Sequence, residues 1–185
     1  MNPSKIKKLN LGSGPYVKKG FDNQDYKKFP GVNLVFDLEK AHYPIKTNTY
    51  DYISCDHVVE HIGNIFGFFN EIHRIAKPGA IVKIECPHWS TNFAFTQIDH
   101  KHYFGLDSLN ILEPTDEQNK SKPFKVLSQR ILFRGSRSSK FMQLVSYPID
   151  KIVNSSHSMQ LVIDRFFSKI IPFYFIEYHL KVLKK

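Results

Sequence analysis

The stretch Leu9-Asn10-Leu11-Gly12-Ser13-Gly14-Pro15 decides the fold of this chain, because it reads as an apolar strand that runs directly into a two-glycine turn. Glycine has no Cβ, so Gly12 and Gly14 can adopt a positive φ and bring backbone N–H groups close to a bound nucleotide or nucleoside. Short Gly-x-Gly turns also connect strands without binding anything. The stretch therefore raises a cofactor-loop hypothesis that the rest of the chain must decide.

Apolar runs separated by loops and helices predict a parallel α/β sheet, with strands over 5–11, 20–25, 32–37, 50–55 and 80–86. The link between the first two strands is too short for a crossover helix, so we expect only roughly one turn there, over 15–19. Ligands of such sheets bind at the carboxyl ends of the strands. The polar candidates at those ends are Gly12 to Gly14, Asp25, Asp37, Asp56, His57 and His88.

The clearest helical signal begins at Asn64, the predicted N-cap, and ends at Pro78-Gly79. A shorter helix is expected just before it, over 57–62. The apolar residues of the longer helix fall on one face, while its polar residues point away. That face consists of Ile65, Phe68, Phe69, Ile72, Ile75 and Ala76.

The second half of the chain has a looser pattern. Residues 88–123 are rich in aromatic residues and histidine without a clear period, which suggests a lid over an active site. We expect a short helix over 108–113, a strand over 124–133, a basic turn over 134–140, a helix over 149–171 and a last strand over 173–183. The apolar face expected for the helix over 149–171 includes Ile152, Met159, Val162, Phe166 and Ile170. No repeat or linker interrupts the chain, so 1–185 is predicted to form one domain.

Composition limits the partners and the cellular location expected for the chain. The chain has 185 residues, a formal net charge of +9 and two cysteines, Cys55 and Cys86, which we expect to be buried or free thiols. The charge would suit an anionic partner, but many lysines are scattered singly, so nucleic acid is the less favoured partner. No window is long and apolar enough for a membrane span, and we expect a cytoplasmic protein. The oligomeric state stays open.

The order of these features resembles the class I S-adenosylmethionine-dependent methyltransferases, in particular the methyltransferase type 11 group, from Leu9 to His88. Leu9 to Gly14 fills the L-x-L-G-x-G motif of that family. Tyr50-Asp51-Tyr52-Ile53, Glu60-His61 and Arg74 to Gly79 then follow in the order of the family's strand, helix and R-x-x-K-P-G series. Two features depart from the family: the first crossover is short, and Ala80 replaces a glycine.

The resemblance implies a Rossmann-like methyltransferase fold, a mostly parallel sheet with helices on both faces and an antiparallel final strand. It also implies that S-adenosylmethionine is the cofactor and S-adenosylhomocysteine the product. Asp25 would take the ribose hydroxyls, with Asp22 as the alternative, and Asp37 with Leu38 would lie by the adenine. The implied cofactor-binding set is Leu11, Gly12, Ser13, Gly14, Asp25, Asp37, Leu38, Asp56 and His57.

The residues support a cationic cofactor independently of the resemblance. Aspartates at the strand ends complement a sulfonium, and the glycine turn has no lysine of the kind a phosphate-binding P-loop carries. The third glycine of the G-x-G-x-x-G pattern is replaced by Val17, which argues against a nicotinamide cofactor.

Methyl transfer is an in-line displacement that needs an aligned acceptor and a group that removes its proton. The candidate bases are His57, His61, His88, His100 and His102. His88 is favoured because it follows a strand, and Asp99 with His102 could orient or replace it. His57, Glu60 and His61 share one helical face and could bind a divalent metal together with His88 or His102. We expect no metal there, because Glu60-His61 also fits the packing feature of metal-free relatives.

The acceptor is the least determined feature. The aromatic residues Trp89, Phe93, Phe95, Tyr103 and Phe104 would shape a pocket for a sugar, lipid-linked or aromatic small molecule, with oxygen as the preferred target atom. The chain lacks the N/D-P-P-[YF] signature of amino-directed nucleic-acid methyltransferases. Two alternatives remain: an RNA methyltransferase that uses the basic segments 130–140 and 181–185, and a non-catalytic subunit with the cofactor fold.

Overall fold

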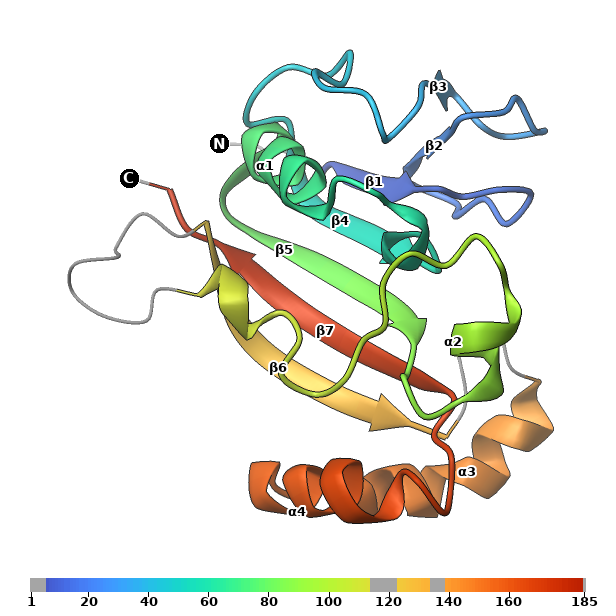
Figure 1. Cartoon of the computed structure of the whole chain (residues 1–185). Helices are drawn as coiled ribbons and strands as arrows, with labels where there is room; N and C mark the ends of the chain where they lie inside the picture. The colour runs from blue at the N-terminus through green and yellow to red at the C-terminus, as the bar shows by residue number, and fades with distance from the viewer. Residues whose placement is uncertain (1–5, 114–122, 134–138, 185) are drawn as a thin grey trace.

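The computed structural model describes residues 6–113, 123–133 and 139–184, and its centre is one open, twisted sheet (Figure 1). The described strands lie in the order β3-β2-β1-β4-β5-β7-β6. Parallel pairing joins β1 (Lys8–Leu11), β2 (Asp22–Asp25), β3 (Leu34–Val35), β4 (Tyr50–Asp56) and β5 (Ala76–Pro87). The last strand, β7 (Phe175–Val182), is antiparallel to both β5 and β6 (Phe124–Leu132). The predicted fold class is confirmed.

Strand β1 is the switch point of the sheet. Leu9 pairs with Asp22 of β2 on one side and with Ile53 of β4 on the other, because the chain runs outward to β3 before it returns. Connections from β1 and β4 therefore leave in opposite directions, which opens a crevice at the carboxyl ends of these strands. Residues 12–21 link β1 to β2 without a helix, as the short spacing predicted.

Helix α1 (Ile65–Ile75) covers one face of the sheet, and a 3₁₀ turn, η1 (Val59–His61), precedes it. The Gly67 N–H donates to Asn64 Oδ1 at 3.0 Å, so the predicted N-cap is confirmed. The helix ends two residues before the expected Lys77, because Ala76 already pairs with Tyr50 at the start of β5. Residue Ala76 thus belongs to the sheet and not to the helical face.

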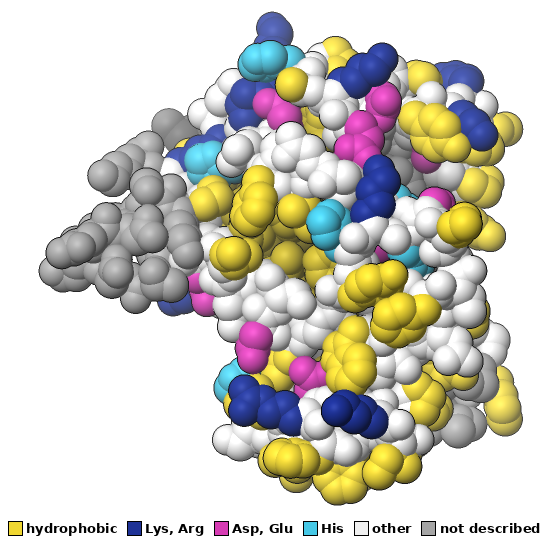
Figure 2. All heavy atoms as spheres, viewed as in Figure 1, with side chains coloured by type: hydrophobic (Ala, Val, Ile, Leu, Met, Phe, Trp, Pro, Cys, Tyr) yellow, Lys and Arg dark blue, Asp and Glu magenta, His cyan; other side chains and the backbone are white. Residues whose placement is uncertain are grey.

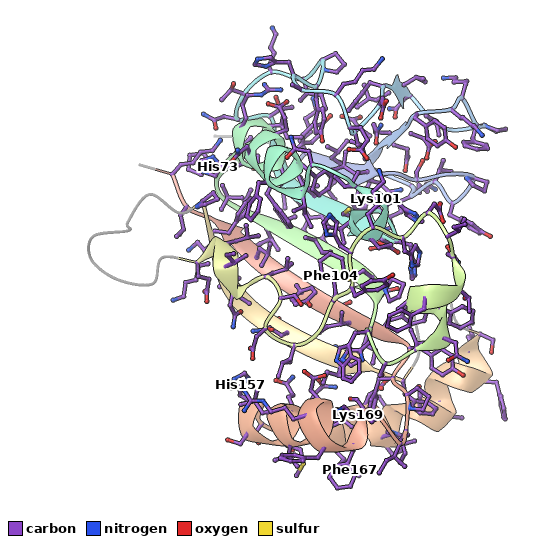
Figure 3. The ribbon with its side chains drawn as sticks, viewed as in Figure 1. His73, Lys101, Phe104, His157, Phe167 and Lys169 are labelled. Carbon is purple, nitrogen blue, oxygen red and sulfur yellow. The ribbon has the colours of Figure 1, made fainter. Side chains whose placement is uncertain are left out.

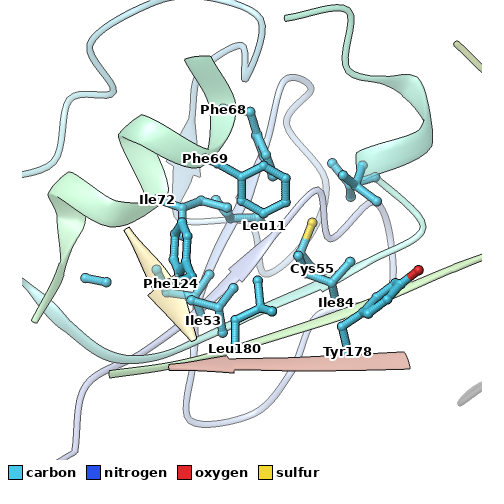
Figure 4. Packing of buried hydrophobic residues seen from close by; sticks show 14 of the residues in the cluster. Leu11, Ile53, Cys55, Phe68, Phe69, Ile72, Ile84, Phe124, Tyr178 and Leu180 are labelled. Carbon is cyan, nitrogen blue, oxygen red and sulfur yellow. The ribbon is translucent and has the colours of Figure 1, made fainter. Parts of the chain in front are cut away.

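The main core lies between α1 and the sheet (Figure 4). Phe68, Phe69 and Ile72 of α1 meet side chains from β1, β4, β5 and β7, and Phe69 contacts Phe124 of β6 edge to face at 5.7 Å between ring centroids. Full burial of side chains of this size contributes about 1.5 to 3 kcal/mol each. One helix therefore joins the parallel strands to the antiparallel end of the sheet.

Several element bounds differ from the sequence expectation. Strand β3 keeps only two residues of the expected 32–37, and α2 (Asn92–Thr96), a short helix capped by Thr91, was not anticipated. The short helix expected over 108–113 is a single 3₁₀ turn, η2 (Asn110–Leu112). The expected basic turn over 134–140 lies mostly outside the described residues.

The helix expected over 149–171 is wrong in its extent. Instead, α3 (Lys140–Val153), α4 (His157–Val162) and a π-helical turn, η4 (Ile163–Phe167), follow one another, with a break at Asn154. The expected apolar face does not pack inward: Ile152 is 63% exposed, Phe166 68% and Ile170 76%. None of the described helices is long and apolar enough to cross a membrane.

The break at Asn154 has a physical cause, because its side chain pairs with the free edge of β6. Its Oδ1 accepts from the Ile131 N–H at 2.9 Å, and its Nδ2 donates to the Ile131 carbonyl at 2.7 Å. Asp150 accepts from the Phe133 N–H, and Gln160 donates to the Gln129 carbonyl. The helices α3 and α4 thus cover the sheet edge, whose unpaired backbone groups would otherwise be exposed.

The edge contacts predict a large effect of Asn154→Ala on stability. Ile131 is fully buried, so its N–H would lose its partner without gaining water, and we expect a loss of about 2 to 3 kcal/mol in the free energy of unfolding. Urea unfolding would measure this loss, with the exposed neighbour Ser155→Ala as control. An effect of Asn154→Ala no larger than that of the control would contradict the assignment.

Candidate functional site

A pocket of about 360 Å³ opens at the carboxyl ends of β1, β2 and β4, at the switch point of the sheet. A larger hollow of about 640 Å³ lies at the opposite ends of the strands, lined by residues such as Lys8, Tyr52 and Gly79. We place the functional site in the smaller pocket, because ligands of open α/β sheets bind at the carboxyl ends. Its lining consists of Gly12, Gln24, Asp25, Tyr26, Asp37, Leu38, Glu39, His57, Val58, His61, Ile62 and Asp99.

Five of the nine candidate cofactor residues line this pocket: Gly12, Asp25, Asp37, Leu38 and His57. The other four, Leu11, Ser13, Gly14 and Asp56, stand outside its lining. The sequence reasoning missed Gln24, Tyr26, Glu39, Val58 and Ile62, since no motif marks them. It named His61 as a candidate base and metal ligand but favoured a packing role for it.

The glycine turn is bonded to β2 and does not present free amides. The Gly12 N–H donates to Gln24 Oε1 at 3.1 Å, and the Gly14 N–H donates to Asp25 Oδ2 at 2.8 Å. Both glycines have positive φ, 58° and 52°. A Cβ on Gly12 would lie 2.2 Å from Val58 Cγ2. The missing Cβ of Gly12 therefore lets the Val58 side chain pack against the backbone of residue 12. This contact holds η1 against the end of β1.

The pocket is acidic. Asp25, Asp37, Glu39 and Asp99 line it, and neither lysine nor arginine belongs to the lining formed by the described residues. Asp25 is almost buried and also accepts from the Lys27 N–H at 3.0 Å, whereas Asp37 is exposed at the mouth. Such a lining attracts a cationic ligand and repels a phosphate.

Lys18, a residue that the sequence reasoning did not single out, neutralises the buried Asp56. Its Nζ donates to Ser54 Oγ at 2.6 Å and to Asp56 Oδ2 at 2.7 Å. Burial by itself would raise the pKa of Asp56, but Lys18 and Lys83 together hold it below its usual range. Asp56 therefore lies in an ion-pair network of the sheet and not in the pocket wall.

His57 lies between two buried carboxylates. Its Nδ1 is 3.5 Å from Glu60 Oε1, its Nε2 is 3.5 Å from Glu85 Oε1, and its φ of 58° is unusual for a residue with a side chain. Burial alone would lower the pKa of His57, but the two glutamates outweigh it and raise the pKa to about 9. His57 thus adds positive charge at one wall of the acidic pocket.

The three predicted catalytic residues do not come together. His88 is fully buried and outside the pocket lining, with Nδ1 2.8 Å from Ser90 Oγ and Nε2 3.0 Å from Asp164 Oδ1. His102 lines a different hollow, next to Phe104. Only Asp99 reaches the pocket, where its Oδ2 lies 3.1 Å from His61 Nδ1.

The segment that contains Asp99 crosses the site. Lys101, labelled in Figure 3, pairs with Glu39 Oε1 at 2.5 Å, and its N–H donates to the Glu60 carbonyl at 2.7 Å. Asp164 of η4 holds the start of the segment by accepting from the Trp89 indole N–H at 2.8 Å. Burial raises the pKa of Asp164, but its bonds to His88 and Trp89 lower it more. The described part of the expected lid therefore contacts the pocket through Asp99, η1 through Lys101 and η4 through Trp89.

This chain is similar to known proteins in part of its sequence and in its fold. Residues 18–84 match the family model described as "Methyltransferase domain". No curated protein matches the sequence. The solved structure of an S-adenosylmethionine-dependent methyltransferase from Archaeoglobus fulgidus is 14% identical to this chain, with a TM-score of 0.59. The match covers 96% of this chain and 86% of that protein's chain.

Two further solved structures show how widely this fold is used. A putative sarcosine dimethylglycine methyltransferase from Galdieria sulphuraria is 16% identical, with a TM-score of 0.56 over 98% of this chain and 79% of its own. The [4+2]-cyclase SpnF is 11% identical, with a TM-score of 0.59 over 97% of this chain and 75% of its own. At these identities the likeness concerns the fold, which can host different reactions.

The contact between Gly12 and Val58 predicts a coupled pair. Gly12→Ala adds a methyl group against Val58 at a positive φ, so we expect it to lower the free energy of unfolding by about 3 kcal/mol. Val58→Ala removes the opposing methyl groups. The double variant should therefore lose about 1 to 3 kcal/mol less stability than the sum of the two single variants. A double-mutant cycle by urea unfolding measures this coupling. Strictly additive effects would show that the two residues do not meet.

Proposed function

We propose that this chain, which has the fold of class I methyltransferases and matches the methyltransferase domain family over residues 18–84, transfers a methyl group from S-adenosylmethionine to a small-molecule acceptor. The observation that carries the proposal is the acidic pocket at the switch point, whose lining includes Gly12, Asp25 and Asp37. A cationic sulfonium nucleoside matches its charge, and its volume is within the range of small-molecule sites.

Within this proposal each end of the cofactor has its own residues. Asp25, nearly buried, would accept the ribose hydroxyls, and Asp37 with Leu38 would lie by the adenine. Charge-assisted hydrogen bonds of this kind are about twice as strong as neutral ones. The glycine turn would then shape the floor of the pocket through Gly12, since its amides are already bonded to β2.

Proton removal from the acceptor falls to Asp99 in this arrangement. Its carboxylate lines the pocket and is 69% exposed, so an acceptor can reach it, whereas His88 is buried and paired. An oxygen acceptor, such as a hydroxyl of a sugar, lipid-linked or aromatic molecule, suits a carboxylate base. The acidic lining also disfavours a phosphate-rich acceptor next to the methyl group, which weighs against RNA.

Binding of S-adenosylhomocysteine tests the cofactor assignment. The nucleoside should raise the unfolding temperature of the protein, and at 100 times its Kd it stabilises the fold by about 2.7 kcal/mol. Asp37→Asn should weaken binding about tenfold, because a charged acceptor is lost at the mouth. Calorimetric titration measures both constants.

The matched control is Asp107→Asn, an exposed carboxylate outside the pocket lining, which should bind like the wild type. No stabilisation by millimolar nucleoside would refute the catalytic proposal and favour a non-catalytic subunit. Equal weakening by both variants would refute the placement of the adenine.

A further inference from the structure

Three side chains beside the pocket converge on one point. Glu60 and His61 belong to η1, and His100 follows α2 in the segment that crosses the site. One ligand atom from each residue lies within 4.8 Å of the other two. We propose that Glu60, His61 and His100 bind a divalent first-row transition-metal ion.

Glu60 is the group that most needs a cation. It is 1% exposed, and neither of its carboxylate oxygens accepts a hydrogen bond from any described residue. Among the described residues, its ion-pair partner is His57, whose Nδ1 lies 3.5 Å from Oε1, beyond good hydrogen-bond distance for a ring N–H. A buried carboxylate without hydrogen bonds is costly, and a directly coordinated metal ion would remove that cost.

His100 is oriented as a ligand. Its Nδ1 lies 3.0 Å from the Ala94 carbonyl oxygen, which can only accept, so this ring nitrogen carries a proton. With Nδ1 as the donor, Nε2 is the ring nitrogen left to act as a ligand. A backbone carbonyl on one ring nitrogen is the usual way to orient a metal-bound histidine.

His61 completes the set. Its ring meets the ring of His100 at 4.7 Å between centroids, and its buried Nδ1 makes no hydrogen bond of proper geometry within the described chain, although Asp99 Oδ2 is 3.1 Å away. The backbone holds the two segments together, because the N–H groups of Lys101 and His102 both donate to the Glu60 carbonyl. The three side chains thus come from two segments that are already joined.

The donor set determines the kind of ion. Two imidazoles and one carboxylate suit Zn²⁺ or Fe²⁺ better than Mg²⁺ or Ca²⁺, which prefer oxygen ligands. Three protein ligands leave at least one coordination position open, and His61 places the site at the pocket lining. The role of this ion in catalysis rests on the proposed function. A metal-bound acceptor hydroxyl would have a lowered pKa, and Asp99 would take its proton.

Metal retention tests this site without the cofactor. Tag-free protein loaded with Zn²⁺ and desalted should retain one ion per chain by elemental analysis, and Co²⁺ should give visible absorption bands. Glu60→Gln and His100→Gln should each weaken Zn²⁺ binding by about 10- to 100-fold. His157→Gln, an exposed histidine of α4, is the matched control and should retain the ion.

Unfolding curves separate a metal ligand from a packing residue. Without metal, Glu60→Gln should be close to the wild type in stability, because Glu60 accepts no hydrogen bond from the described residues and would lose only its 3.5 Å ion pair with His57. With Zn²⁺, only the wild type and His157→Gln should gain stability. Absence of a retained ion in the wild type, or equal retention by Glu60→Gln, would overturn the site, whatever the outcome with S-adenosylhomocysteine.

A separate observation concerns the helices at the β6 edge. Between residues 140 and 171 they expose large apolar side chains, and Phe167, labelled in Figure 3, points away from the sheet. Figure 2 shows hydrophobic side chains along this rim with Lys or Arg side chains beside them. We define the apolar helical face by Phe141, Leu144, Tyr147, Ile152, Phe166 and Ile170, each more than half exposed.

The exposed charges of residues 140–171 have one sign. Lys140, Lys151, Arg165 and Lys169 are exposed, whereas both acidic residues of the segment turn inward. Asp150 accepts from the Phe133 N–H and is 3% exposed, and Asp164 pairs with His88 and Trp89. Apolar side chains ringed by basic ones match the boundary of an anionic lipid layer.

We infer that the apolar helical face binds anionic membrane surfaces from one side. A second copy of this chain is the other occupant to consider, but the same basic residues would then oppose one another. A lipid surface removes the apolar side chains from water and neutralises the lysines at once.

Vesicle sedimentation tests this inference. The protein should bind vesicles of phosphatidylglycerol and phosphatidylcholine at least tenfold better than vesicles of phosphatidylcholine alone. Phe166→Ser with Ile170→Ser should lower this binding at least tenfold, and Lys151→Glu with Lys169→Glu should remove the preference for anionic lipid. Phe66→Ser, 56% exposed on α1, is the control that keeps binding.

Equal binding to both vesicles, or no binding, would overturn the inference. A concentration-dependent dimer that the Phe166→Ser, Ile170→Ser variant dissolves would assign the face to a second copy instead.

Discussion

The absence of a side chain at residue 12 is the constraint on which the site depends. Because Gly12 has no Cβ, Val58 can pack against the backbone at the end of β1, and η1 follows directly after Val58. His57 and His61, on either side of this contact, line the same pocket as Asp25 and Asp37. A glycine that looks like a cofactor contact in sequence thus also acts as a packing contact, and the two roles do not exclude each other.

Buried charge is the second organising feature. The face of the sheet away from α1 carries Lys83, which lies 3.5 Å from Asp56, 3.5 Å from Glu85 and 3.2 Å from Glu177. Burial raises the pKa of Glu177, but His179 and Lys83 lower it to about 2. In the same network Lys18 reaches back from the short β1–β2 link. The link has no crossover helix, and its Lys18 side chain instead pairs with Ser54 and Asp56 near the end of β4.

The second half of the chain serves the first half in two ways. Its helices pair with the backbone of β6 through Asp150, Asn154 and Gln160 and thereby protect the edge of the sheet. Its segment from Trp89 to Gly105 lies across η1 and brings Asp99, His100 and Lys101 to the site. Edge protection uses the polar side of the helices and leaves their apolar side in solvent, which is why periodicity alone assigned that side to the core.

The sequence by itself determined the parallel strands, the N-cap at Asn64, the missing first crossover helix and the acids at the ends of β2 and β3, because each rests on local chemistry within a few residues. Only the tertiary structure decided which of these groups meet. It paired Asp56 with Lys18, buried His88 against Asp164, and joined His100 to Glu60 and His61. These pairings link residues 38, 76 and about 40 positions apart, and such distances depend on how the sheet is wound, which no local pattern encodes.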